Sequence, residues 1–242
     1  MNLDLSITHD VQLVWLAAAI TLVVLVAGAK VITGGLVSTG KFANLVESMV
    51  EFVRTNICEE FLGHHAKAWF GFFATLFFFL LFNNLLGKIP IPGLHSPTGN
   101  INVTVALAVT VFVVAQAVGI IKLGPVGYFK KKFLLPAPLW VQIPAIPIMF
   151  LVLLAEPFSL AVRLFANMTA GHMVLLTFAT AQMVGGVWLL GQENFLAKSV
   201  AVLPFALSVV LIAFELFVAF IQAFIFTLLS ALYLSESLEE HH

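Results

Sequence analysis

Five long runs of apolar residues limit what this chain can fold into. A helix crosses the roughly 30 Å hydrocarbon core of a bilayer with about 20 apolar residues. Residues 11–29, 68–87 and 101–121 meet that length, and two longer runs follow at 157–192 and 199–234. Only 10% of the 242 residues are charged, whereas a soluble domain carries about 25%. The sequence therefore predicts an all-α integral membrane protein with about five membrane-inserted helices.

The last two runs are too long for ordinary spans. Built as a straight helix at 1.5 Å per residue, each would be about 54 Å long, nearly twice the hydrocarbon core. We therefore expect two long, strongly tilted or bent helices at the C-terminal end. Before them, residues 133–155 contain Pro136, Pro138, Pro144 and Pro147. Prolines at this density interrupt regular helix, so this stretch is expected to form a re-entrant or interfacial connector.

Lysine and arginine residues predict the orientation of the chain, because short cytoplasmic loops carry an excess of them. Residues 30–67 and 122–132 hold four basic residues each, whereas Lys88 and Lys198 are alone in the alternating loops. This pattern places the N-terminus outside and the C-terminus in the cytoplasm. Residues 41–62 alternate apolar side chains, including Leu45, Val53 and Ile57, with charges. That spacing is typical of an amphipathic helix on the inner membrane surface.

These features describe a single membrane domain, residues 1–242, in three parts. Residues 1–67 hold the first span and the amphipathic segment, residues 68–132 hold two further spans, and residues 133–242 hold the connector and the two long helices.

Arg163 is the only formally charged residue between Pro157 and Gln192. An arginine at mid-bilayer costs about 2.5–3.5 kcal/mol on insertion scales. One interpretation is a structural ion pair within the subunit, for which Glu156 and Glu215 are the candidate partners. The other, which we favour, is an arginine that faces a water pocket or an acidic residue of a partner chain.

Polar residues of the long helices fall on defined faces, since each helical residue turns by about 100°. Asn167 follows Arg163 by four residues and shares its face, whereas His172 follows by nine and lies opposite. In the last helix one narrow polar stripe is formed by Ser208, Glu215, Gln222 and Ser230. His172 alone fits a packing histidine. With Glu215 in the neighbouring helix, a proton relay is favoured.

Two segments carry a family resemblance. Residues 157–172, PFSLAVRLFANMTAGH, resemble the signature of subunit a of the F-type ATP synthase membrane sector. Residues 217–235, FVAFIQAFIFTLLSALYLS, are similar to the C-terminal helix of that family, and FNNLLGKIP (82–90) and PTGNINVT (97–104) match its weaker outer-loop patterns. The resemblance covers most of the chain from Phe82 onward.

The resemblance implies a rotary proton channel. Subunit a is the stator that forms two aqueous half-channels against a rotating ring of c subunits, each with one proton-carrying carboxylate. Arg163 would keep the passing carboxylate ionised and separate the half-channels. The implied partners are the c ring, the peripheral-stalk b subunits and the lipid of a bacterial plasma membrane. ATP chemistry would take place on other subunits, so this chain is expected to be non-catalytic towards ATP.

The resemblance also implies roles for single residues. His172 and Glu215 match the polar pair of the outer half-channel, in the reverse order to some members. Asn167 and Gln222 match residues near the arginine, Asn84 one that lines the outer path, and Ser159 one near the inner path. Gly87 and Asn100 stand where many relatives have an acid, and residues around Met149 are apolar where some carry a glutamate. Glu156 is our hypothesis for that missing inner charge.

Weaker signals leave alternatives open or exclude functions. Asn83 and Asn84 suit either a water path or the backbone groups at a helix end, while for Asn100 capping is favoured. The runner-up function is a stand-alone proton-coupled transporter with Arg163 binding an anionic substrate, although such proteins usually have broken helices in both halves. A purely structural membrane subunit would have no use for Arg163, His172 and Glu215 at membrane depth. We expect no cofactor, no metal site, and, without a basic tract, no nucleic-acid partner.

Overall fold

The structure, a computed structural model, describes residues 9–33, 41–88, 96–133, 139–181 and 195–238. All regular elements among these residues are helices. Five stretches are long and apolar enough to cross a membrane: Asp10–Gly28, Asn44–Leu86, Ile101–Leu123, Trp140–Phe178 and Leu207–Leu238. The predicted all-α membrane fold and its five spans are confirmed.

The N-terminal half begins with α1 (His9–Thr33), followed by a continuous helical segment made of α2 (Lys41–Val53), the π-helical turn η1 (Arg54–Glu59) and α3 (Glu60–Leu62). Gly63, at φ +49°, ends that segment. The short turn η2 (Gly63–His65) then leads into α4 (Ala66–Leu86).

The segment 41–62 is the amphipathic helix that the sequence predicts. Val53 and Ile57 are fully buried while Arg54 is exposed. Leu45, expected on the apolar face, is 57% exposed, and its neighbour Val46 is buried instead. The reason is rotational: one residue turns the helix by about 100°, and the core contacts of Val46 fix which of the two adjacent side chains points inward.

Aromatic side chains hold this segment to the rest of the molecule. The ring centroid of Phe52 lies 5.8 Å from that of Phe220 and 5.3 Å from that of Phe224. Phe77 packs edge-on against Phe220 at 5.7 Å. Tilted and edge-to-face pairs of this kind add to the burial of apolar area. The cluster joins α2 to α4 and to the last helix of the chain.

The central helices are η3 (Pro97–Gly99), α5 (Ile101–Leu123) and α6 (Pro125–Phe133). Asn100 caps α5, because its Oδ1 accepts a hydrogen bond from the backbone N–H of Asn102 at 3.0 Å. Its Nδ2 donates to Asp10 Oδ2 at 2.7 Å and so ties α5 to the start of α1. The predicted capping role of Asn100 is confirmed.

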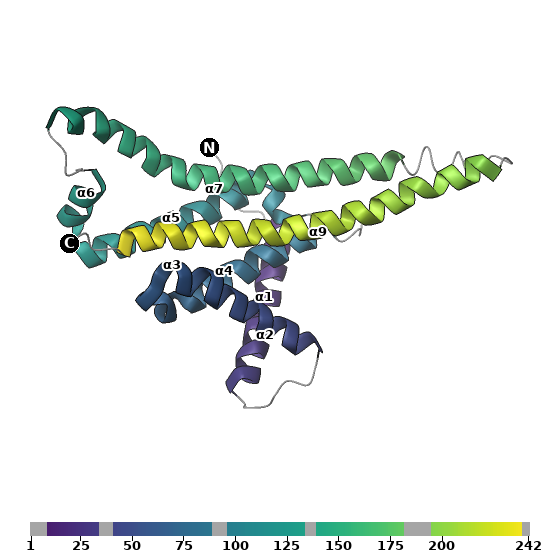
Figure 1. Ribbon diagram of the computed structural model, residues 1–242, viewed down its shortest axis with the longest axis horizontal. Coiled ribbons are helices and arrows are strands. Elements are labelled where there is room, and N and C mark those ends of the chain that lie inside the picture. Colours follow the sequence, from purple (N-terminus) through teal and green to yellow (C-terminus); the bar gives the residue numbers. More distant parts are fainter. Residues whose placement is uncertain (1–8, 34–40, 89–95, 134–138, 182–194, 239–242) are drawn as a thin grey trace.

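The sequence prediction of an irregular connector is wrong for residues 139–155, while Pro136 and Pro138 lie outside the described residues. A single helix, α7 (Leu139–Ala181), runs through Pro144, Pro147 and Pro157. Each proline removes one backbone hydrogen bond and bends the helix. In a bilayer, however, an irregular segment would leave many more backbone groups unpaired, so a bent helix is the less costly arrangement. Figure 1 shows the N-terminal part of α7 curving away from the straighter remainder.

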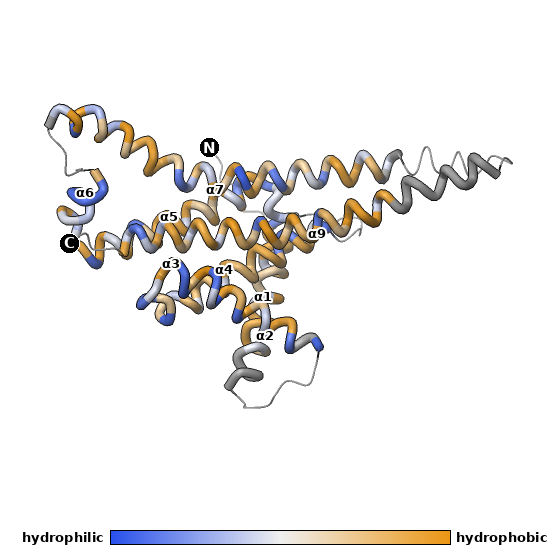
Figure 2. Tube along the Cα trace, viewed as in Figure 1, coloured by the Kyte–Doolittle hydropathy of each residue, from blue (hydrophilic) through white to orange (hydrophobic). Residues whose placement is uncertain are grey.

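The last helix, α9 (Phe195–Leu238), lies beside α7 along the longest dimension of the molecule (Figure 1). α5 packs against both, α4 packs against α9, and α1 packs on α4. In the same view α1 runs across the direction of α7 and α9. Figure 2 shows both long helices apolar over most of their described length, with isolated hydrophilic residues between. At 43 and 44 residues, α7 and α9 are the two long C-terminal helices that the sequence predicts.

Candidate functional site

A buried ion pair marks the centre of the site. Lys88, which follows the end of α4, places Nζ 3.0 Å from Glu215 Oε2 of α9, and the two side chains are 4% and 7% exposed. Burial of an unpaired charge is very costly, whereas a paired charge is tolerated. The pair therefore connects α4 and α9 at the level of the predicted outer path.

Helix α7 approaches this pair through a glycine. A Cβ atom on Gly171 would lie 2.7 Å from Lys88 Nζ and 3.4 Å from Glu215 Oε1. The absence of a side chain at this position thus makes room for the ammonium group. Because His172 is the next residue of α7, the structure brings the helical turn that carries His172 beside Glu215, as the predicted relay requires.

Asn84 crosslinks three elements in the same region. It is fully buried, its Nδ2 donates to the Ala219 carbonyl of α9 at 3.3 Å, and its Oδ1 accepts from Thr98 Oγ1 at 2.8 Å. Ser96 extends the network through a 2.6 Å contact between its hydroxyl and that of Thr98. Asn84 therefore bonds to other elements and does not satisfy the backbone groups at the end of its own helix.

The polar stripe of α9 faces the interior. Glu215, Gln222 and Ser230 are buried, and Ser208 is half-buried. Ser230 is satisfied within its own helix by a 2.7 Å hydrogen bond to the Phe226 carbonyl. Gln222 Nε2 and Glu215 Oε1 have no hydrogen-bond partner among the described residues. These two unsatisfied groups flank Ala219, the contact of Asn84, on one face of the helix.

Arg163 lies on an exposed face of α7. It is exposed, and its Nη2 makes a long 3.4 Å hydrogen bond to Ser159 Oγ one turn earlier. Ser159 is also exposed, and Asn167, one turn later, is half-buried. Serine, arginine and asparagine thus form a short polar row along one face of a mostly apolar helix.

The carboxylates proposed as internal partners of Arg163 are paired elsewhere. Glu156 Oε1 lies 3.6 Å from Lys132 Nζ of α6, with side chains 10% and 12% exposed, and Glu215 pairs with Lys88. Among the residues that the structure describes, Arg163 forms no ion pair with a carboxylate. The interpretation of Arg163 as half of an internal ion pair is not supported.

Sequence reasoning assigned Lys88 and Lys132 only to the loop charges that set orientation. Both are partners of buried glutamates, and neither pairing follows from spacing, since each joins residues distant in the chain. The sequence does contain one indication of these pairs. Two glutamates lie in apolar surroundings, where an ionised carboxylate needs a cationic partner, and the chain has few lysines. Which lysine serves which glutamate depends on helix packing.

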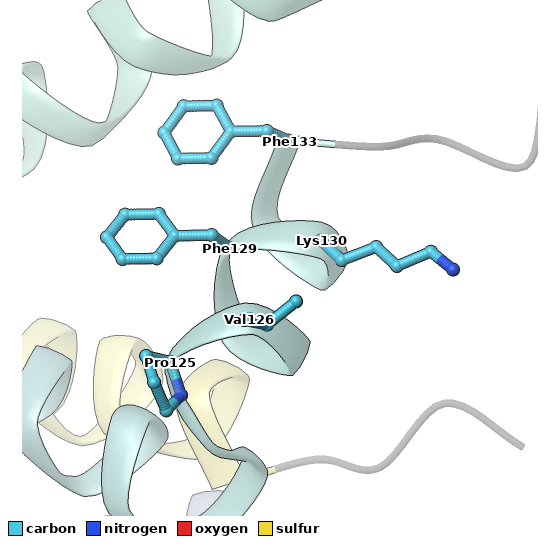
Figure 3. Close-up of a pocket in the computed structure, with 5 residues that line it drawn as sticks. All are labelled: Pro125, Val126, Phe129, Lys130 and Phe133. Carbon is cyan, nitrogen blue, oxygen red and sulfur yellow. The ribbon is translucent and has the colours of Figure 1, made fainter.

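A second feature lies apart from this site. On α6, an apolar pocket of about 520 Å³ is lined by Pro125, Val126, Phe129, Lys130 and Phe133 (Figure 3). Phe129 and Phe133 stack with ring centroids 6.1 Å apart. Lys130 is the one titratable residue of its lining, which holds no carboxylate, imidazole or hydroxyl group.

Comparison with known proteins gives consistent results. The profile of the family described as ATP synthase A chain matches residues 11–235. ATP synthase subunit a of Myxococcus xanthus is 39% identical over 241 residues, which span 99% of this chain and 75% of that protein. ATP synthase subunit a 2 of Chlorobium luteolum is 38% identical over 96% of this chain and 65% of its own length. ATP synthase subunit a of Anaeromyxobacter dehalogenans is 40% identical over 99% of this chain and 60% of its own length. The chain thus spans about two thirds of the length of these relatives.

Proposed function

The chain belongs to the ATP synthase A chain family, and we propose that it is the proton-conducting stator subunit of an ATP synthase membrane sector. In this proposal two aqueous half-channels meet the rotating c ring on either side of Arg163. Protons enter through one half-channel, travel on ring carboxylates, and leave through the other. The chain itself performs no chemistry on ATP.

The observation that carries the proposal is the state of Arg163. A guanidinium group is permanently charged, and its place in an apolar helix is costly. Within the described residues it gains only one long hydrogen bond, while the internal carboxylates are bound to lysines. An exposed cation of this kind fits an acidic group of a partner chain. A ring carboxylate that passes along the exposed face of α7 supplies one.

Arg163 then acts in two ways. Its charge stabilises the ionised form of each arriving carboxylate, which releases the proton into the exit path. It also repels protons, so it blocks direct flow between the half-channels. The second effect matters because one charge that crosses 100 mV dissipates about 2.3 kcal/mol. Asn167 and Ser159 extend the polar row on either side of the arginine.

The outer half-channel is assigned to the interior face of α9. Glu215 and the turn of α7 that carries His172 lie together. Gln222 continues the polar face along α9, and Asn84 of α4 contacts that helix at Ala219. A carboxylate and an imidazole in adjacent helices can hand a proton from one to the other. Ser208 lies two turns before Glu215 on the same stripe, towards the other end of the helix.

The proposed partners rest on the family to which the chain belongs and, for the c ring, on the exposure of Arg163. The c ring faces Arg163, peripheral-stalk b subunits hold the stator, and the chain sits in a bacterial plasma membrane with its N-terminus outside. The runner-up, a stand-alone transporter with Arg163 binding an anionic substrate, is not favoured by the family to which the chain belongs.

The proposal is tested with Arg163→Ala in inverted membrane vesicles that contain the assembled complex. ATP-driven acidification reports coupled pumping, and proton leak after removal of the ATPase sector reports the seal. The matched control is Arg54→Ala. Arg54 is the only other arginine, is exposed, and pairs with Glu51 and Glu59.

We expect Arg163→Ala to abolish pumping and raise the passive leak, with normal pumping in Arg54→Ala. Preserved pumping in Arg163→Ala, with the complex assembled, would refute the proposed role of this residue. A loss of pumping in both variants would indicate that removal of any arginine disturbs assembly.

A further inference from the structure

Lys88 places a fixed positive charge inside the candidate outer path. Its ammonium is almost fully buried, lies 3.0 Å from Glu215 Oε2, and fills the space left open by Gly171. A buried ion pair contributes little to stability, because the cost of desolvating both groups offsets most of their electrostatic attraction. Linking two helices is therefore a weak reason for burying this pair. A special space for the ammonium suggests a function for its charge.

We propose that Lys88 is a selectivity residue: a tethered cation that excludes Na⁺ and other metal cations from Glu215 while leaving the carboxylate open to protons. The proposal rests on the proposed function, because it takes Glu215 as a member of the proton path. It names the ion that the outer path admits.

A metal cation meets two obstacles beside Glu215. Hard cations are held by several oxygen ligands at once, but the neighbours of this carboxylate include an ammonium, which offers donors and no lone pair, and the carbon of Gly171. The ammonium also repels a second cation. At about 4 Å that repulsion lowers occupancy roughly fivefold in water and about a thousandfold at the lower dielectric typical near protein surfaces.

A proton feels the same repulsion as any other cation, but it does not meet the first obstacle, because it needs no set of oxygen ligands. It needs a single lone pair, and Glu215 Oε1 is buried with no hydrogen-bond partner among the described residues. In the transfer an O–H bond of a hydronium ion breaks, an O–H bond forms at Oε1, and water remains. The proton then leaves to an imidazole nitrogen of His172 or to a further water. The side chains of the neighbouring hydrogen-bond network, on Asn84, Ser96 and Thr98, are neutral.

The test measures passive proton conduction in inverted vesicles stripped of the ATPase sector, as a function of added NaCl. The flux is driven by a pH jump, and choline chloride keeps the ionic strength constant. The variants are Lys88→Met, which removes the charge at similar length, Lys88→Arg, which keeps it, and Gly171→Ala, whose new Cβ displaces the ammonium. Wild-type protein with the same ring sets the baseline for Na⁺ effects at the ring itself.

We expect Na⁺ to inhibit conduction in Lys88→Met at a concentration at least about tenfold lower than in wild type, whereas Lys88→Arg stays near wild type. Equal Na⁺ responses in wild type and Lys88→Met would overturn the proposal, as would equal inhibition of Lys88→Met and Lys88→Arg. If Lys88→Met does not assemble, Gly171→Ala decides, since it keeps both charges: increased Na⁺ inhibition supports the proposal, and a wild-type response refutes it.

Arg163→Ala, assayed in parallel, separates this inference from the function on which it rests. Normal pumping in Arg163→Ala contradicts the stator role. A wild-type Na⁺ response in Lys88→Met, with pumping lost in Arg163→Ala, removes only the selectivity role of Lys88.

Discussion

At the scale of single residues, the free-energy cost of a charge in an apolar helix identifies functional candidates better than residue type does. Arg163, Glu156 and Glu215 attract attention in the sequence because charges are expensive in apolar helices. The structure then separates them: the two glutamates are each bound to a lysine, and the arginine faces outward with one long hydrogen bond. Residues that carry a charge without an internal partner are those available to a partner chain.

Asn84 provides a residue-scale prediction. Asn84→Ala should leave the Thr98 hydroxyl and the Ala219 carbonyl without their buried partner, at a cost of about 1–3 kcal/mol. A lower melting temperature of the detergent-solubilised complex and reduced passive proton conduction are expected. Asn102→Ala is the matched control, because Asn102 is exposed and uses only its backbone N–H in the α5 cap. Equal effects of the two variants would argue against a special role for Asn84.

Glu156 provides a second residue-scale prediction. If it supplies the inner exit, Glu156→Gln should slow proton release to the cytoplasmic side several-fold, measured as ATP-independent flux in stripped vesicles. The exchanged pair Lys132→Glu with Glu156→Lys restores opposite charges at this contact. We expect it to leave the flux low. Normal proton release in Glu156→Gln, or recovery of the flux in the exchanged pair, would show that Glu156 only links α6 to α7.

At the scale of elements, run length predicts the helices well and proline predicts their interruption poorly. Helices α1, α4 and α5 start and end within a few residues of the predicted limits. Pro144 and Pro147 nevertheless lie inside α7. The rule that proline breaks helix assumes water as an alternative partner for the freed carbonyl groups. In hydrocarbon that alternative is absent, so the helix bends and continues.

The end of α9 allows an element-scale prediction. Lys122 Nζ donates to the Leu238 carbonyl at 2.7 Å, and Lys131 Nζ to the Glu236 carbonyl at 2.8 Å. A cation at a helix C-terminus contributes about 0.3–1 kcal/mol. Lys122→Met with Lys131→Met should therefore speed hydrogen exchange of the last turn of α9. Lys130→Met is the control, since Lys130 lines the α6 pocket instead. Unchanged exchange in the double variant would contradict the capping role.

At the scale of the whole molecule, aromatic packing unites the N-terminal segment with the site. Phe52 contacts Phe77 of α4 and Phe220 and Phe224 of α9. The same α9 carries Glu215 a little more than one turn before Phe220. Residues 41–62 are thus a support for the helix that holds the candidate path, in addition to their predicted place at the membrane surface.

Phe52→Ala tests this support. Loss of a large aromatic side chain from a packed core costs about 3 kcal/mol or more, and we expect the lower end because Phe52 is only half-buried. The melting temperature of the complex should fall, with pumping retained at low temperature. Phe158→Ala removes the same group from a position that is 69% exposed, and it should leave the melting temperature unchanged. Equal destabilisation by both variants would contradict this role of Phe52.

The sequence by itself determined the membrane class, the number of spans, and the polar residues with a cost to explain, including Arg163, His172 and Glu215. These are local properties, because run length, periodicity and the expense of a charge are all read along one helix. Only the tertiary structure decided that Lys88 pairs with Glu215 and that Lys132 pairs with Glu156. It also decided that Gly171 leaves space for the Lys88 ammonium. Those relations join residues far apart in the chain, and they exist only once α4, α6, α7 and α9 have packed.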